Sequence, residues 1–191
     1  MKKIHSFVCA AGILFLCGCV PSFFPVYTDK DLTFNENLLG SWTNDDKTET
    51  WIFSKKDSNT YALTCVGENE GKTKTADTFD ARLAKLGKYF FLDTFPSGSN
   101  CSGPDYNAHF MAMHMIMKIE AGKEKLSFSM LNDKWLQKAL KEKKTDIETI
   151  ADGDRIFMAA PTDKLQQFYL KWAGDKEAFS QKTTLLRLAR P

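Results

Sequence analysis

The stretch NAHFMAMHMIMKIEAGKEKLSFSML, residues 107–131, decides the fold class. Apolar side chains occupy every second position in much of it, on both sides of a turn at Gly122. Because successive side chains of a strand point to opposite faces, this alternation predicts two antiparallel strands, each burying one face. We therefore expect a β-hairpin here, with a row of methionines on the buried face of its first strand.

The same alternation recurs along the chain. The further strands that it predicts lie within residues 48–54, 59–66, 77–95 (a hairpin with Gly87 in its turn), 155–160 and 183–189. About eight or nine short strands separated by turn residues predict a mainly β fold, an antiparallel barrel or sandwich, rather than alternating β and α units.

Two segments have helical periodicity instead. Residues 132–144 begin at an Asn/Asp cap, and residues 162–174 have Thr162 as the expected N-cap and Gly174 as the stop. Apolar residues recur at helical spacing in the second segment, so we expect this helix to pack against the sheet. The chain carries no repeat of fixed period, and we expect one folded domain.

The N-terminus has the organisation of a secretory leader. Lys2 and Lys3 precede an apolar run over residues 7–16, which is shorter than the roughly 20 residues that a membrane span needs. The run ends in Leu16-Cys17-Gly18-Cys19, which resembles a bacterial lipobox. The resemblance implies removal of residues 1–18, a diacylglycerol thioether on Cys19, and an acyl group such as palmitate on its new amine. An ordinary signal peptide that happens to contain cysteine is the alternative.

The domain plan follows from this leader. We expect residues 19–37 to be the lipidated cysteine and an extended linker, since Pro21 and Pro25 disfavour a helix, and residues 38–191 to be the barrel domain. By the sorting rule of enterobacterial lipoproteins, Val20 after the cysteine implies the outer membrane, with the protein facing the periplasm. The formal net charge of +2 comes from Lys2 and Lys3 alone, which argues against a nucleic-acid binder that relies on a basic surface.

Two cysteines remain after the leader and Cys19. Cys65 falls in an expected strand, and Cys101 falls in the loop SGSNCSGPD, residues 97–105. An even number of cysteines in an oxidising compartment favours a disulfide between them. Two free thiols are the alternative, because pairing geometry cannot be read from a sequence.

Leu39-Gly40-Ser41-Trp42, at the first expected barrel strand, resembles the Gly-x-Trp signature of the lipocalin (calycin) superfamily. The resemblance implies that Trp42 closes one end of a barrel and that a basic residue of the last strand, Arg187 or Arg190, lies across it. A wider pattern that includes residues 21–43 and 79–96 is similar to a family of uncharacterised bacterial lipoproteins. That family implies the fold and the cell-envelope location, and no activity.

The methionine strand has three interpretations. Met111, Met113, Met115 and Met117 share one face with His109, and His114 lies on the other. They can be plain core, or they can line a pocket for an apolar ligand together with Phe128. The third interpretation is a Cu(I) site, with His109, Met113 and Met115 as its candidate ligands. Metal ranks last because a neighbouring strand offers few further soft ligands, and the role of His114 stays open.

No catalytic motif is present: there is no nucleophile elbow, no His-Glu-x-x-His and no glycine-rich phosphate loop. We therefore expect a protein that is not an enzyme and that has no cofactor besides the lipid on Cys19. The expected function is binding of a small apolar ligand or lipid by a membrane-anchored barrel. The alternatives are a non-catalytic envelope structural or interaction module with a filled barrel, and Cu(I) binding. The membrane is the expected partner through the anchor, and a protein partner stays open.

Overall fold

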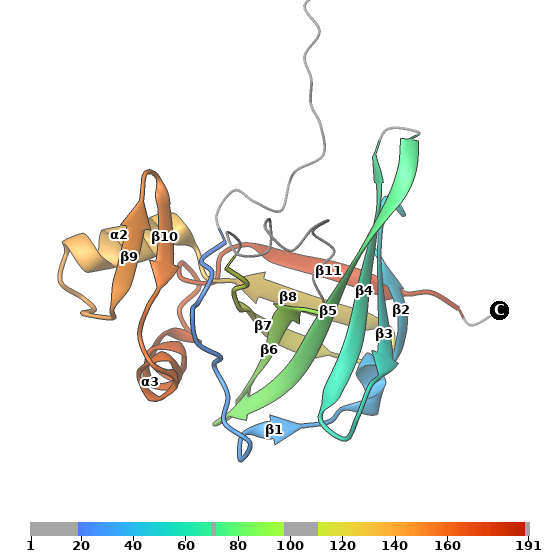
Figure 1. The fold of residues 1–191 in the computed structure, drawn as a ribbon, viewed down its shortest axis with the longest axis horizontal. Helices are drawn as coiled ribbons and strands as arrows, with labels where there is room; N and C mark the ends of the chain where they lie inside the picture. Colours follow the sequence, from blue (N-terminus) through green and yellow to red (C-terminus); the bar gives the residue numbers. More distant parts are fainter. Residues whose placement is uncertain (1–18, 70–71, 98–110, 190–191) are drawn as a thin grey trace, which may run out of the picture.

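An antiparallel sheet of nine strands forms the body of the molecule in the computed structural model, which describes residues 19–69, 72–97 and 111–189 (Figure 1). Its strands are β1 (Leu32–Thr33), β2 (Gly40–Thr43), β3 (Glu49–Lys55), β4 (Thr60–Asn69), β5 (Lys72–Leu86), β6 (Tyr89–Pro96), β7 (Met115–Ala121), β8 (Lys125–Met130) and β11 (Lys182–Arg187). The order is β1-β5-β4-β3-β2-β11-β8-β7-β6, and pairing of β5 with β6 closes the sheet. Since β1 lies at the edge of β5, the closed barrel has eight strands.

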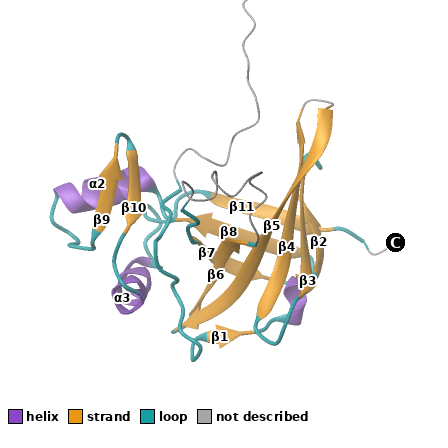
Figure 2. Cartoon of the chain, in the orientation of Figure 1, coloured by secondary structure: helices purple, strands orange, loops and turns teal. Residues whose placement is uncertain are grey.

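A smaller layer lies against one side of the barrel (Figure 2). It consists of α2 (Asp133–Lys141), α3 (Thr162–Trp172) and the hairpin of β9 (Thr149–Asp152) and β10 (Arg155–Met158). A short 3-10 helix, η1 (Glu36–Leu38), precedes β2. The expected mainly β fold, a lipocalin-like antiparallel barrel with two packed helices, is confirmed.

Two hydrophobic cores hold these layers, and the alternation of the strands divides residues between them. In β6, for example, Leu92 belongs to the core inside the barrel, whereas Phe91 belongs to the core between the barrel and the helices. The inner core includes Trp42, Trp51, Phe53, Tyr61, Leu63, Leu83, Met117, Leu126 and Phe128. The outer core includes Val20, Val26, Ile116, Leu136, Met158, Leu165, Phe168, Tyr169 and Phe179.

The strand expected within residues 155–160 is present as β10. It pairs with β9 in a separate hairpin, whose turn holds Gly153 at φ 58°, and not with the barrel. The N-cap expected at Thr162 is wrong: Pro161 is at the cap position, and Thr162 is the first residue of α3, with its hydroxyl donating to the carbonyl of Pro25. The cap at Asn132 is confirmed, because its side chain accepts the backbone N–H of Trp135.

The segment expected to be a linker, residues 19–37, does not stand away from the barrel. Val20 is 3% exposed and lies in the outer core. Ser22 exchanges two backbone hydrogen bonds with His114, at 2.9 Å each, so the segment pairs with the chain just before β7. It then crosses between the barrel and the helical layer to reach β1 (Figure 1). The folded domain therefore begins at Val20, well before residue 38.

Candidate functional site

The methionine strand is shorter than its sequence pattern. β7 begins at Met115, because the backbone of His114 pairs with Ser22 of the N-terminal segment instead of extending the barrel ladder. Met111 is consequently 69% exposed, and its expected place in a barrel wall is wrong. Met113 is half-buried ahead of the strand, and His109 lies outside the described residues.

Met115 and Met117 lie on the face of the strand that the alternation predicts. Met117 is 3% exposed within the inner core and pairs with Met130 of β8. Met115 lies on the same face of β7 and is half-buried at the start of the strand. The row of four is thus reduced to one fully buried thioether and one at the end of the barrel.

Aromatic rings fill the middle of the barrel. Phe128 stacks on Trp51 with ring centres 4.6 Å apart and an interplanar angle of 18°. Trp51 also contacts Phe53, which meets Tyr61 edge-on at 6.1 Å. These rings come from β3, β4 and β8 and pack together inside the barrel. Phe128, expected to line a ligand pocket, takes part in this aromatic packing, and its contact with a ligand stays a prediction.

Trp42 and Arg187 close one end of the barrel. Trp42 is fully buried, and its indole N–H donates to the carbonyl of Leu38 at 2.8 Å. The guanidinium of Arg187 lies over the indole, 4.1 Å from its centre. Its N–H groups donate to the carbonyls of Leu39, Asn37 and Lys123. Arg187 is therefore the basic residue that lies across the tryptophan, and Arg190 falls outside the described residues.

The glycine of the Gly-Ser-Trp motif has a physical role at the same end. Gly40 has φ 113°, a conformation that residues with a Cβ rarely adopt. A Cβ at this position would also lie 3.0 Å from a guanidinium nitrogen of Arg187. The glycine thus lets the backbone turn into β2 while the arginine passes close over it.

Of the two cysteines expected to form a disulfide, the structure describes only one. Cys65 lies on the inner side of β4 beside the inner core, and Cys101 lies outside the described residues. Burial, with smaller effects of the Glu49 and Asp77 carboxylates, raises the pKa of the Cys65 thiol to about 12. The disulfide stays a prediction. Across the described part of the chain, no group of three or more His, Cys, Asp or Glu side chains is placed to hold a metal ion.

A buried polar cluster that sequence reasoning missed lies between the barrel and α3. Its centre is Asp93 of β6, which is 1% exposed. One carboxylate oxygen of Asp93 lies 2.7 Å from Nδ1 of His114, and the other accepts the backbone N–H of Val26 at 2.9 Å. The pair therefore connects β6, the start of β7 and the N-terminal segment. The only sequence signal was one acid within the apolar run YFFLDTF.

Electrostatics around Asp93 are dominated by its burial. Burial raises the pKa of the Asp93 carboxyl, and the hydrogen bond from His114 and the charge of Arg82 only partly oppose this. Arg82 itself donates to the hydroxyl of Tyr27 at 3.0 Å. The hydroxyl of Tyr169 is buried here and has no hydrogen-bond partner among the described residues.

Ser22, His114 and Asp93 bring three catalytic residue types together, but not in catalytic geometry. The Ser22 hydroxyl donates to the carbonyl of Phe24 at 2.7 Å and is therefore not directed as a donor to the imidazole. Ser22 is also fully buried, so a substrate would not reach it. The arrangement ties three segments of backbone together.

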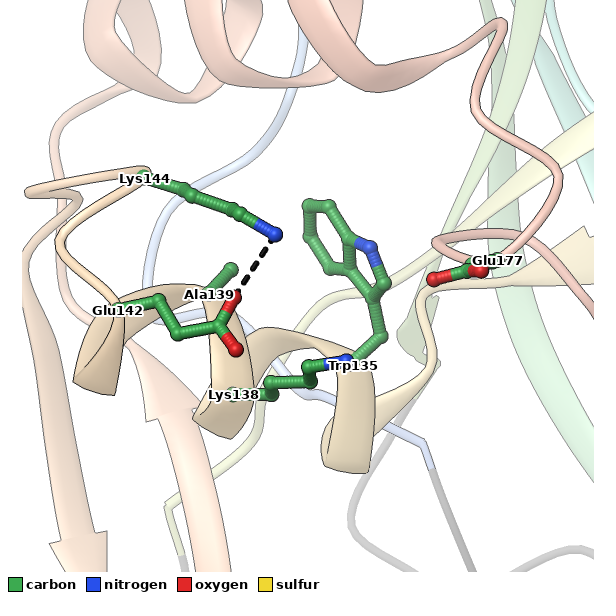
Figure 3. Close-up of a pocket in the computed structure, with 6 residues that line it drawn as sticks. All are labelled: Trp135, Lys138, Ala139, Glu142, Lys144 and Glu177. Atoms are coloured by element: carbon green, nitrogen blue, oxygen red, sulfur yellow. Dashed lines mark ion pairs between the residues drawn. The ribbon is translucent and has the colours of Figure 1, made fainter.

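A shallow hollow lies on the helical layer, outside the barrel (Figure 3). It is lined by Trp135, Lys138, Ala139, Glu142, Lys144 and Glu177. Lys144 reaches over it and forms a 2.7 Å ion pair with Glu142, beside the indole of Trp135. The hollow therefore has an aromatic wall and a rim of both charges.

Within the described ranges, no helix combines the length and the apolar character needed to cross a bilayer. No family model, no curated protein and no solved structure matches the chain.

Proposed function

We propose that the protein is a lipid-anchored lipoprotein of the cell envelope whose filled barrel acts as a non-catalytic structural and interaction module. The anchor is the lipidated Cys19 of the lipobox, on the periplasmic side of the outer membrane. The observation that carries the proposal is the packing of Trp51, Phe128, Phe53 and Tyr61 inside the barrel. Pockets for drug-sized ligands need several hundred cubic ångströms, and these rings occupy the place where such a pocket would lie.

An apolar-ligand binder is the competing proposal, and fewer structural observations support it. It depended on a wall of four methionines with Phe128, of which Met111 is exposed and Phe128 is covered by Trp51. Cu(I) binding has a similar weakness because, of its two candidate thioethers, only Met115 belongs to β7, whereas Met113 lies ahead of the strand.

Ligand uptake by the mature chain, residues 19–191 with Cys19→Ala, separates the two proposals. We expect native mass spectrometry of protein purified without detergent to show no bound lipid. We also expect no fluorescence gain with an apolar naphthylamine probe. Phe128→Ala is the matched positive control, since removal of a core ring leaves a cavity that small apolar molecules enter. A stoichiometric lipid on the unmodified barrel, displaced by the probe, would overturn the proposal.

Interaction is tested in cells with the full chain. A photoreactive phenylalanine analogue at Lys138, on the rim of the hollow, should crosslink to an envelope protein, whereas the same analogue at exposed Lys85 of β5 should not. Equal crosslinking at the two positions, or none at Lys138, would remove the interaction role and leave only the structural one.

A further inference from the structure

The chain is fixed to the fold directly after Cys19. Val20 is buried in the outer core, and the carbonyl of Pro21 accepts the backbone N–H of Met158 at 2.8 Å. Ser22 is held by its two hydrogen bonds to His114. Consecutive Cα atoms lie about 3.8 Å apart, so Cys19 cannot move more than a few ångströms from the surface of the domain.

Cys19 lies at a definite end of the barrel. Its Sγ is 2.8 Å from Sδ of Met130, the last residue of β8. Burial, and to a smaller extent the Asp133 carboxylate at the start of α2, raises the pKa of the Cys19 thiol. Ser129, next to Met130, pairs with Lys182, the first residue of β11, whereas Arg187 is the last residue of β11. Cys19 is therefore at the end opposite the Trp42–Arg187 pair.

The two ends are well separated. β11 has six residues, and at about 3.3 Å each they extend over roughly 20 Å. Cys19 is only half-buried, so a group attached to it can leave the fold towards solvent. Lys134 of α2 and Lys182 are exposed at the same end, and each can meet a lipid phosphate.

We propose that this end of the barrel, with the start of α2, docks on the headgroups of the bilayer that holds the anchor. The inference rests on the lipidation of Cys19 in the proposed function. The acyl chains lie in the hydrocarbon layer and hold Cys19 at headgroup level. Because the chain is packed into the fold from Val20 onward, the domain is held close to the headgroups as well. The Trp42–Arg187 end then points away from the membrane. A spacer of ten Gly/Ser residues would instead allow roughly 15–20 Å of free movement.

Quenching of a fluorophore by headgroup nitroxides measures this orientation. Lys134→Cys and Lys123→Cys are made separately in the full chain carrying Cys65→Ala and Cys101→Ala, and the mature lipoproteins are labelled and reconstituted. Both lysines are exposed, and Lys123 lies beside Arg187 at the far end. The vesicles contain phosphatidylethanolamine, phosphatidylglycerol and a small fraction of lipid with a nitroxide on its headgroup.

We expect several-fold stronger quenching at position 134 than at position 123. Ten Gly/Ser residues inserted between Cys19 and Val20 should make the two values converge. Lys182→Cys is a second near position if Lys134→Cys disturbs α2. Equal quenching without the insertion would overturn the orientation. The mass of the reconstituted protein is measured in parallel, and a mass without acyl groups would instead overturn the anchor on which the inference rests.

Discussion

The guanidinium of Arg187 lies 4.1 Å from the centre of the Trp42 ring and joins the last barrel strand to the first. The contact combines a cation–π interaction with hydrogen bonds to three backbone carbonyls, which belong to the segment before β2 and to the β7–β8 turn. A single side chain thus holds three parts of the barrel end in register.

Arg187→Lys is expected to cost nearly as much stability as Arg187→Ala, about 2–4 kcal/mol, because an ammonium cannot reach three carbonyls and lie flat on the indole. Urea unfolding of the mature chain measures the change. Arg155→Ala is the matched control. Arg155 lies over Phe157 at 4.9 Å but is exposed, so its loss should cost about 0.5–1 kcal/mol. Full rescue by lysine would show that charge alone is needed at position 187.

Gly40→Ala should destabilise the same end by about 1–3 kcal/mol, since it adds a Cβ at a positive φ and 3.0 Å from Arg187. Gly67→Ala provides the comparison, because a Cβ at Gly67 meets nothing within 4 Å. Thermal unfolding should therefore show a clear loss for the first variant and little change or a small gain for the second. Similar effects of the two substitutions would contradict the role given to Gly40.

Asp93 should make stability fall as pH rises. Its folded pKa lies above the ordinary value of about 3.9, so between these two values the native state holds a proton that the unfolded chain has lost. The contribution of this group is largest below its ordinary pKa and is lost as pH rises through its raised one. Asp93→Asn, which stays neutral, should gain stability relative to the unmodified protein over this window.

Urea unfolding at a series of pH values measures that difference. Asp80→Asn is the control, because Asp80 forms a surface ion pair with Lys56 at 2.7 Å and its loss should change stability little. Asp93→Ala leaves the Val26 N–H without its acceptor and should cost about 2–4 kcal/mol. Parallel pH profiles for the Asn variant and the unmodified protein would argue against a buried carboxyl with a raised pKa.

The sequence predicted the barrel well because the pattern that specifies each strand lies within that strand. Alternation marks which side chain of each strand faces inward, and Gly40-Ser41-Trp42 with a late arginine marks the closed end. The point where β7 begins could not be predicted from local sequence. Met111 follows the same alternation as Met117, but the pairing of His114 with Ser22 ends the strand. Such competition between segments 92 residues apart leaves no periodicity in either one.

The polar cluster was missed for a similar reason. An acid in the run YFFLDTF is compatible with a solvent-facing position of an alternating strand, as is found for Asp80 in β5. Only the packing of the N-terminal segment and α3 over that face buries Asp93, and this segment was expected to be a linker. The prolines that disfavour a helix do not distinguish a free spacer from a packed extended strand.

Cys65 should resist alkylation in the folded protein. With a pKa of about 12, only about one thiol in 10⁴ is ionised at pH 8, compared with roughly a quarter for an ordinary cysteine. In the mature chain with Cys19→Ala and Cys101→Ser, iodoacetamide should modify Cys65 only after unfolding, as followed by mass spectrometry.

The chain that keeps Cys101 tests the expected disulfide. If the bridge is present, neither cysteine is modified even in denaturant until a reductant is added. Rapid modification of Cys65 in the folded Cys101→Ser variant would contradict the raised pKa of its thiol.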